Sequence, residues 1–394
     1  MDPRLYEKYS RQILFAGIGE AGQQRLLDSS AVLVGCGALG TAVANLLVRA
    51  GLGRLRIIDR DFVEPSNLQR QILYDEADAR DALPKAIAAE RKLRAINSGV
   101  TVEGIVADLT PNNTEELLGG FPLILDGTDN FETRFLVNDA AIHLGIPWIY
   151  AAAVASYGLT MTVLPGETAC LACLLQSQGT HAAGVEETCD TAGVLGAAVG
   201  VIASLEAAEA IKLLIGKREA LHERLISADV WSGHWQAIRV ARNPQCRACA
   251  RREFIYLEGD AQPHLTMCGR DSVQIHERSR KLDLDELRRR LAPTVTEVRN
   301  NDFLLRFRVP VLASTQAAGA ASSPSRVARA ADSEGFEGAV PGKVEGPLPK
   351  GAEGLVVNSV EGYEVTVFAD GRAIIKGTRD PAVARSLYAR FIGS

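Results

Sequence analysis

Apolar runs alternate with helical patterns along roughly the first 150 residues of the chain. The apolar runs predict strands at 31–35, 54–59, 101–106, 122–126 and 147–150. The intervening patterns predict helices at 41–50, 84–97 and 131–144, with Pro84 at the first position of its helix. Strands that alternate with helices favour an α/β fold built on a doubly wound, mainly parallel sheet.

The pattern changes beyond this sheet. Alternating residues at 156–166 predict antiparallel strands that extend it, and a long helix is expected at 192–216, ending at Gly216. Between Ala313 and Glu353, 25 of 41 residues are Ala, Gly, Ser or Pro. This composition cannot bury enough apolar surface to fold, so the tract 313–353 is expected to be flexible.

A small α+β module is expected on either side of this tract. Its predicted elements are a helix at 282–292, a strand at 296–309, a hairpin at 363–376 turning at Asp370-Gly371, and a final helix with Asp380 as N-cap and Pro381 at its first position. We therefore predict two domains, 1–253 and 254–394.

The composition favours a compact enzyme in a reducing compartment. The chain has 394 residues, 47% of them hydrophobic, and a net charge of −5, so neither a nucleic-acid surface nor a basic membrane patch is predicted. The N-terminus lacks the apolar core of a signal peptide. The uncharged run between Asp190 and Glu206 is too short and small-sided to span a membrane, so we expect a buried or dimer-interface helix there. Seven cysteines without an export signal favour the cytoplasm.

A glycine motif follows the first predicted strand. The strand Ala31 to Val34 leads into Gly35-x-Gly37-x-x-Gly40 and a helix, an arrangement that presents backbone N–H groups to a phosphate. Asp59 ends the next strand, where its carboxylate can bind a ribose. These features predict a Rossmann-like nucleotide site. Taken alone they also fit a nicotinamide dehydrogenase, but such a site has no use for the polar, cationic cluster Ser66 to Gln71 beside the phosphates.

Further motifs make the chain resemble the MoeB/ThiF adenylyltransferases, relatives of the ubiquitin-activating enzymes. The matching motifs are Tyr9-Ser10-Arg11-Gln12, the glycine loop, Asp59-x-Asp61, Ser66-Asn67-Leu68-Gln69-Arg70-Gln71, Lys85 after Pro84, Asp126-Gly127-Thr128-Asp129-Asn130 with Arg134, and two Cys-x-x-Cys pairs. They occur in the family's order over about the first 250 residues. The resemblance implies activation of a carboxylate by ATP with loss of pyrophosphate.

This chemistry concentrates negative charge on phosphoryl oxygens, so cations and a metal must lie there. Arg70 and Lys85 are the candidates for the α- and β/γ-phosphates, and Asp129 for Mg²⁺. Outside this context both cations would be surface charges, and Asp129 could instead cap the helix that starts at Phe131. Asp126 either shares the metal or satisfies a turn.

The resemblance extends to polar residues around these groups. Asn67 and Gln71 are expected to help hold the triphosphate, although loop amides also cap turns. Arg11 is expected to reach the ATP of a partner subunit across a dimer interface, and the alternative is an arginine on a helix surface. Arg134 and Asn138 lie on one helix face, where they either line the pocket or bridge elements. The predicted nucleotide-binding residues are Arg11, Gly35, Gly37, Gly40, Asp59, Asp61, Asn67, Arg70, Gln71, Lys85, Asp126, Asp129 and Asn130.

The two Cys-x-x-Cys pairs are Cys170/Cys173 and Cys246/Cys249, separated by 72 residues. Four thiolates at this spacing suit tetrahedral Zn²⁺, which would form a structural staple without an open coordination position. The alternative is two redox dithiols, but neither pair opens a thioredoxin-like unit.

Cys189 has no partner cysteine nearby in the sequence. It follows a polar tract, 176–187, that is expected to be mobile, and it precedes a helix whose N-terminus would lower its pKa. In the family a cysteine in this neighbourhood can bond covalently to the activated carrier, but an inert buried thiol is the alternative, and the adjacent acidic residues oppose thiolate formation. Cys36 and Cys268 are expected to pack, and His181 to be solvated.

We therefore predict a homodimeric adenylyltransferase that activates the C-terminal glycine of a small β-grasp, ubiquitin-like sulfur carrier. The product would accept sulfur in the synthesis of thiamine, molybdopterin or a related cofactor. The C-terminal module has no recognisable rhodanese-like loop, so a separate sulfur donor is expected, and the module is a candidate cradle for the carrier. The alternatives are adenylation of a small molecule or tRNA nucleoside, a dehydrogenase, and an inactive scaffold.

Overall fold

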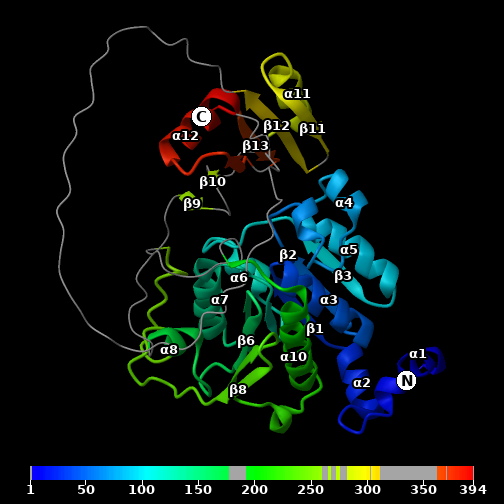
Figure 1. Cartoon of the computed structure of the whole chain (residues 1–394). Helices are drawn as coiled ribbons and strands as arrows, with labels where there is room; N and C mark the ends of the chain where they lie inside the picture. Colours follow the sequence, from blue (N-terminus) through cyan, green and yellow to red (C-terminus); the bar gives the residue numbers. More distant parts are fainter. Residues whose placement is uncertain are drawn as a thin grey trace, which may run out of the picture. The chain divides into compact units, whose positions relative to one another are not determined.

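The computed structural model describes residues 2–176, 192–259, 265–267, 272–275, 282–301, 303–310, 362–369 and 371–393. The chain divides into two compact units, Met1–His264 and Leu265–Ser394 (Figure 1). The predicted division at residue 253 lies a little before this boundary.

The first unit is built on an eight-stranded sheet with the order β3-β2-β1-β4-β5-β6-β7-β8. The strands are β1 (Ser30–Val34), β2 (Arg54–Ile58), β3 (Thr101–Ile105), β4 (Ile124–Asp126), β5 (Trp148–Val154), β6 (Tyr157–Val163), β7 (Leu225–Asp229) and β8 (His234–Ile238). The pairs within β3 to β5 are parallel, and those from β5 to β8 are antiparallel. The predicted parallel sheet and its antiparallel extension are confirmed.

Helices cover the two faces of this sheet (Figure 1), and a buried apolar cluster lies on each face. Along β1, Ala31 and Leu33 belong to one buried cluster, and Val32 and Val34 to the other, as the two-residue period of a strand requires. The first cluster includes residues of α3 (Ala38–Ala50), α5 (Lys85–Ile96) and α10 (Gly196–Leu214); the second includes residues of α7 (Phe131–Leu144) and α8 (Leu171–Gln176). The other helices within the described residues of this unit are α1 (Pro3–Ile13), α2 (Gly19–Leu27), α4 (Glu76–Arg80) and α6 (Thr114–Leu118), with 3₁₀ turns at Pro65–Asn67 and Arg218–Ala220.

Several predicted helix boundaries shift. Helix α7 has the predicted bounds, but α3 begins at Ala38, three residues early, so that Gly40 lies in its first turn. Pro84 is the N-cap of α5 and not its first residue, because its backbone is extended, with φ −55° and ψ 134°. Helix α10 is shorter than the expected 192–216. Within the described part of the chain, no helix is both long and apolar enough to cross a membrane.

The second unit is an α+β module with its own core. Its antiparallel sheet has the order β11-β12-β13-β14-β10-β9, and α11 and α12 pack against the same core. The elements are β9 (Leu265–Met267), β10 (Ser272–Ile275), α11 (Leu284–Leu291), β11 (Thr296–Asn300), β12 (Leu304–Pro310), β13 (Gly362–Phe368), β14 (Ala373–Lys376) and α12 (Pro381–Phe391).

The prediction of one strand at 296–309 is wrong, because the segment folds into two antiparallel strands, β11 and β12. Asn301 causes the reversal: its side-chain oxygen accepts the N–H groups of Phe303 and Leu304, each at 2.9 Å. The N-cap role of Asp380 is confirmed, since its carboxylate accepts the Ala382 N–H at 2.8 Å. The predicted flexible tract 313–353 and Asp370 lie outside the described residues.

Candidate nucleotide-binding site

The predicted site residues gather at the carboxyl ends of β1, β2 and β4. Strand β1 has β2 on one side and β4 on the other. The chain therefore adds β2 and β3 on one side of β1, and then crosses over to add β4 and β5 on the other side. Open α/β sheets bind ligands at such a switch point. The glycine loop follows β1, Asp59 and Asp61 follow β2, and the turn 127–130 follows β4.

Two glycines of the glycine loop, Gly35 and Gly40, lie too close to neighbouring backbone for a side chain. Gly35 has a φ of +86°, and a Cβ on Gly40 would lie 2.2 Å from the Gly35 carbonyl oxygen. A Cβ on Gly127 would lie 2.1 Å from the same oxygen, so the loop and the turn after β4 are in direct backbone contact. Gly37 is the N-cap of α3 and makes no side-chain cap. The first N–H groups of α3 therefore suit a phosphate.

Asp59 holds this loop in place. One carboxylate oxygen accepts the Cys36 N–H at 2.6 Å, and the other accepts the Asp61 N–H at 2.7 Å. Burial raises the pKa of Asp59 to about 6, although the charge of Lys85 opposes the rise. The carboxylate therefore has a structural role, because it fixes the backbone of the glycine loop. Its role at the ribose stays a prediction.

Lys85 is a buried cation at the start of α5. Its ammonium donates to the Asp61 carboxylate at 2.9 Å, and its side chain is 10% exposed. Burial by itself would lower the pKa of Lys85, but the charges of Asp61 and Asp59 outweigh it and raise the pKa above its usual range. The charge of Asp129 acts in the same direction. The ammonium is therefore fully charged at neutral pH.

The segment 66–71 contributes three predicted residues. Arg70 is partly exposed and donates to the Ser66 carbonyl at 2.9 Å. Asn67 caps a turn by accepting the Glu64 N–H at 3.0 Å. Gln71 is buried beside Gly37, and its side-chain oxygen has no hydrogen-bond partner among the described residues. An unsatisfied buried amide at the glycine loop fits a ligand that completes the site.

Asp126 faces the protein interior, so of its two expected roles the structure favours the turn. One oxygen accepts the Thr128 N–H at 2.9 Å and its hydroxyl at 2.6 Å, and the other lies 3.4 Å from the Arg134 guanidinium. Arg134 also donates to the carbonyls of Thr128 and Ala151, at 2.7 and 3.1 Å. It is thus a bridge between α7, this turn and β5.

Asp129, in contrast, is exposed. The alternative in which it caps α7 is wrong, because Asn130 is the N-cap and accepts the Thr133 N–H at 2.9 Å. The Asp129 carboxylate accepts a hydrogen bond of 3.4 Å from the Asn130 amide, and no other hydrogen bond to it is found among the described residues. It is therefore available to a cation, and an exposed carboxylate next to the phosphate loop has the donor chemistry that Mg²⁺ prefers.

Glu206 on α10 is a site residue that sequence reasoning missed. It is fully buried, and one carboxyl oxygen accepts the Asp126 N–H at 3.0 Å while the other has no hydrogen-bond partner in the described part of the chain. Burial and then the charge of Asp126 raise the pKa of Glu206 well above its usual range. The available signal was a carboxylate, followed one turn later by Glu209, in a helix of mainly small apolar residues.

The remaining candidates lie at the edges of the site or outside the described residues. Arg11 is exposed on α1. Cys36 is buried, and burial followed by the charge of Asp59 raises its pKa to about 12, which fits its expected packing role. Cys189, His181 and Cys268 lie outside the described residues, as does almost all of the tract 176–187.

The four predicted zinc ligands come together although 72 residues separate the pairs. Their sulfurs all lie within 4.8 Å of one another, with Cys170–Cys246 at 3.6 Å and Cys173–Cys249 at 3.4 Å. Tetrahedral Zn²⁺ with bonds of about 2.3 Å requires sulfur separations of about 3.8 Å. The cluster thus has the size that a metal needs.

Helix α7 fixes both Cys-x-x-Cys pairs. The Asn138 side-chain oxygen accepts the Leu171 N–H at 2.9 Å, beside Cys170. The buried Asp139 carboxylate pairs with Arg247 at 2.9 Å, beside Cys246. Asn138 is therefore a bridging residue and not part of the nucleotide crevice.

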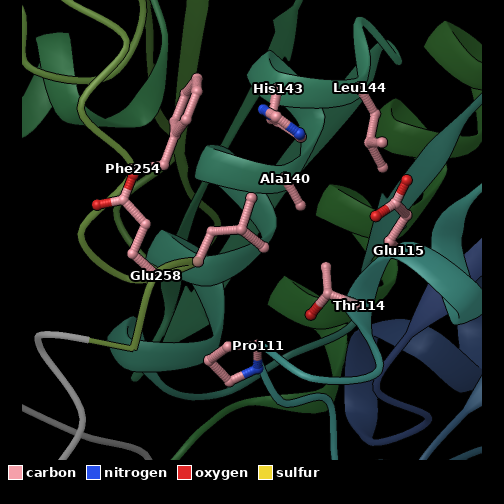
Figure 2. A pocket seen from close by; sticks show the side chains of 9 residues that line it. Pro111, Thr114, Glu115, Ala140, His143, Leu144, Phe254 and Glu258 are labelled. Carbon is pink, nitrogen blue, oxygen red and sulfur yellow. The ribbon is translucent and has the colours of Figure 1, made fainter.

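A cavity of about 280 Å³ lies elsewhere in the first unit, between α6, the C-terminal half of α7 and the segment 254–258 (Figure 2). His143, Phe254 and Glu258 line it together with Glu115. It contains none of the predicted site residues. The candidate site is the crevice at the strand ends.

Comparison with known proteins agrees with this geometry. The ThiF family model matches residues 9–248. The chain belongs to the ThiF family. This part of the chain contains the whole nucleotide crevice and three of the four clustered cysteines, with Cys249 one residue beyond.

Two similar proteins match different lengths of this chain. The sulfur carrier protein ThiS adenylyltransferase of Bacillus subtilis is 40% identical over 390 residues, 98% of this chain and 99% of the relative. The Escherichia coli protein of the same name is 38% identical over 250 residues, 63% of this chain and 97% of its own length. The match with the B. subtilis protein therefore includes the C-terminal module, whereas the match with the E. coli protein does not.

Solved structures support the fold. E. coli MccB crystallised with ATP has a TM-score of 0.53 at 24% identity, covering 61% of this chain and 74% of MccB. MccB with MccA-N7isoASN gives a TM-score of 0.55 over 62% and 74%. The expected family and fold are confirmed.

The unpaired carboxyl oxygen of Glu206 generates a prediction. Above the ordinary glutamate pKa of 4.5, the unfolded chain loses a proton that the folded chain keeps, so the free energy of unfolding falls with rising pH by up to about 1.4 kcal/mol per pH unit. Glu206→Gln keeps an acceptor for the Asp126 N–H and does not titrate. In urea denaturation, its free energy of unfolding relative to wild type should rise between about pH 5 and pH 8.

Glu209→Gln on the same helix is the control. The Glu209 carboxylate is paired with Lys212 at 2.5 Å, so its loss should destabilise the fold at neutral pH. A Glu206→Gln difference that stays constant with pH would contradict a protonated Glu206.

Proposed function

We propose that the chain uses Mg·ATP to adenylate the C-terminal glycine carboxylate of a small ubiquitin-like sulfur carrier, releasing pyrophosphate. The activated carrier would then receive sulfur for the synthesis of thiamine, molybdopterin or a related cofactor. The observation that carries the proposal is a buried, charged Lys85 that is linked through Asp61 and Asp59 to the glycine loop. The exposed Asp129 lies in the turn whose Gly127 contacts the same loop. The near full-length match to an adenylyltransferase of a sulfur carrier supports the substrate class.

The reaction places a defined demand on these residues. A carboxylate oxygen of the carrier attacks the α-phosphorus, the bond to the bridging oxygen of the β-phosphate breaks, and that oxygen leaves with pyrophosphate. Negative charge grows on the leaving group and on the α-phosphoryl oxygens, and fixed cations stabilise it. Lys85 and Arg70 are the proposed cations. Asp129 would hold Mg²⁺, which supplies further charge neutralisation on the phosphates when bound.

Carrier-dependent ATP–pyrophosphate exchange tests this proposal. We expect Lys85→Ala or Asp129→Ala to lower the exchange rate by about two orders of magnitude or more, because each removes a group that stabilises transition-state charge. Lys92→Ala is the matched control on the same helix. Lys92 is partly exposed and forms ion pairs with Asp75 and Asp78, neither of which is a proposed ligand of ATP, so its loss should leave exchange nearly unchanged.

A loss below about threefold for both site variants would overturn the proposed site. Exchange that requires tRNA or a small carboxylate, and no carrier protein, would assign the same adenylation chemistry to a different substrate.

The edge strand β8 is the proposed docking surface for the carrier. Every residue of β8 is exposed. In the described part of the chain the strand pairs with β7 alone, which leaves its outer backbone groups open to another strand. Trp231 in the preceding turn is 82% exposed, and Trp235 on the strand is 53% exposed. Exposed tryptophans beside an open edge are typical of a protein interface, and a β-grasp carrier has strands that can pair there.

Trp235→Ala and Trp231→Ala should raise the KM for the carrier by about tenfold, a typical loss for an interface tryptophan. The KM for ATP should change less than about twofold, because neither residue lies at the nucleotide crevice. Exchange kinetics with varied carrier and varied ATP measure both values. Ile255→Ala, a truncation of another exposed apolar side chain, is the control, and an equal effect there would contradict docking at β8.

We propose that the cysteine cluster binds structural Zn²⁺. Four buried sulfurs leave no position for substrate, so the metal would tie the two Cys-x-x-Cys pairs together without taking part in the reaction.

Purified protein should contain about one zinc ion per chain by elemental analysis. Cys246→Ser should lose most of it and lower the midpoint of thermal unfolding by several degrees. Cys36→Ser, outside the cluster, should retain it. Zinc-free protein with an unchanged midpoint in the presence of a chelator would exclude this role.

Two further parts of the proposal concern the assembly. Leu14 and Phe15, just beyond α1, are 70% and 65% exposed, which supports a homodimer interface that would bring Arg11 to a partner's ATP. A covalent carrier link through Cys189 and a separate sulfur donor belong to the same proposal.

A further inference from the structure

Five residues of the nucleotide crevice form a closed ring of hydrogen bonds. Asp59 accepts the N–H groups of Cys36 and Asp61, at 2.6 and 2.7 Å. Asp61 accepts the backbone N–H and the ammonium of Lys85, at 2.8 and 2.9 Å. The Tyr74 hydroxyl closes the ring, because it lies 2.7 Å from the Cys36 carbonyl and 3.1 Å from the Lys85 carbonyl.

We infer that Tyr74 is a positioning residue for ATP: its hydroxyl fixes the glycine loop relative to Lys85, and so sets the phosphate-binding geometry. This inference rests on the proposed use of ATP, and it adds a residue that neither the motifs nor the expected chemistry include.

The hydrogen bond from Tyr74 is important because it reaches the middle of the glycine loop. Cys36 lies between Gly35 and Gly37, in a loop that glycines leave flexible. Asp59 holds the N–H of the peptide unit that precedes the Cys36 Cα, and Tyr74 holds the carbonyl of the peptide unit that follows it, so both units are restrained. Rotation of these units would turn the N–H groups at the start of α3 away from a phosphate.

The Tyr74 hydroxyl joins the ring of hydrogen bonds as an uncharged donor. The side chain is 7% exposed. Burial, with the neighbouring Cys36 and Asp59, raises the pKa of Tyr74 well above its usual range, so the hydroxyl stays a donor. Its single proton is shared between two carbonyls on separate segments, the glycine loop and the first turn of α5.

Tyr74→Phe removes the hydroxyl that closes the ring of hydrogen bonds and retains the aromatic side chain. We expect the dissociation constant for Mg·ATP to rise about 3- to 10-fold, the range for losing one buried hydrogen bond. The dissociation constant for adenosine, which has no phosphate, should change less than about twofold. Titration calorimetry on the full chain measures both, and it needs no carrier protein.

Tyr388→Phe is the matched control. The Tyr388 hydroxyl also donates to a buried backbone carbonyl, that of Gly371, at 2.7 Å, in the C-terminal module. Both variants should shift the midpoint of thermal unfolding slightly, whereas only Tyr74→Phe should weaken ATP. An unchanged ATP affinity, or an equal loss of affinity for ATP and adenosine, would overturn the inference.

A double-mutant cycle provides a second measurement. If Tyr74 acts partly through Lys85, the effect of Tyr74→Phe on ATP affinity should be smaller in a Lys85→Ala background. Additive effects would mean that Tyr74 does not act through Lys85. Failure of carrier-dependent exchange in the wild type would overturn the proposed function and leave this binding comparison intact.

Discussion

The nucleotide crevice depends on how one residue of the glycine loop, Cys36, is held through the two peptide units that flank it. Its N–H is bound by Asp59 and its carbonyl by Tyr74, while a Cβ on Gly40 or Gly127 would collide with the neighbouring Gly35 carbonyl. The loop therefore combines backbone that must lack side chains with side chains from elsewhere that remove its freedom. A phosphate site built from backbone N–H groups requires this rigidity, because a donor that has to reorient during the reaction stabilises the transition state less.

Burial then assigns different roles to the acidic residues around the loop. Beneath the turn after β4, Arg134 provides one positive charge for two buried carboxyl groups, Asp126 and Glu206. A second buried negative charge without a partner is costly, which is why the pKa of Glu206 is raised so far. Asp129, three residues after Asp126, is exposed and keeps its oxygens for a ligand. Closely spaced carboxyl groups thus become a turn support, a neutral acceptor and a candidate metal ligand through environment alone.

The sequence predicted the strands, the family and the grouping of the site, because each signal was local. The glycine spacing, Asp59 after β2 and the Cys-x-x-Cys pairs all express a short-range geometric need. What it could not predict depends on contacts between distant segments. Tyr74 is an ordinary apolar position until it meets the Cys36 carbonyl, and Glu206 contacts a residue 80 positions earlier. The single strand expected at 296–309 failed for the opposite reason, since one Asn301 side chain reverses an otherwise continuous β pattern.

The resting partner of Lys85 bears on how ATP would bind. A buried ammonium without a counter-ion would lose its proton or destabilise the fold, and Asp61, whose side chain is 40% exposed, supplies that counter-ion at 2.9 Å. Under the proposed function, the phosphates meet a lysine that is already charged and already held by its backbone. The Asp61 side chain is more exposed than that of Lys85. When the ammonium donates hydrogen bonds to phosphate oxygens, water can therefore replace the hydrogen bond that the carboxylate loses. The ion pair thus keeps the charge in place at little reorganisation cost, which is the condition for electrostatic catalysis in a preformed site.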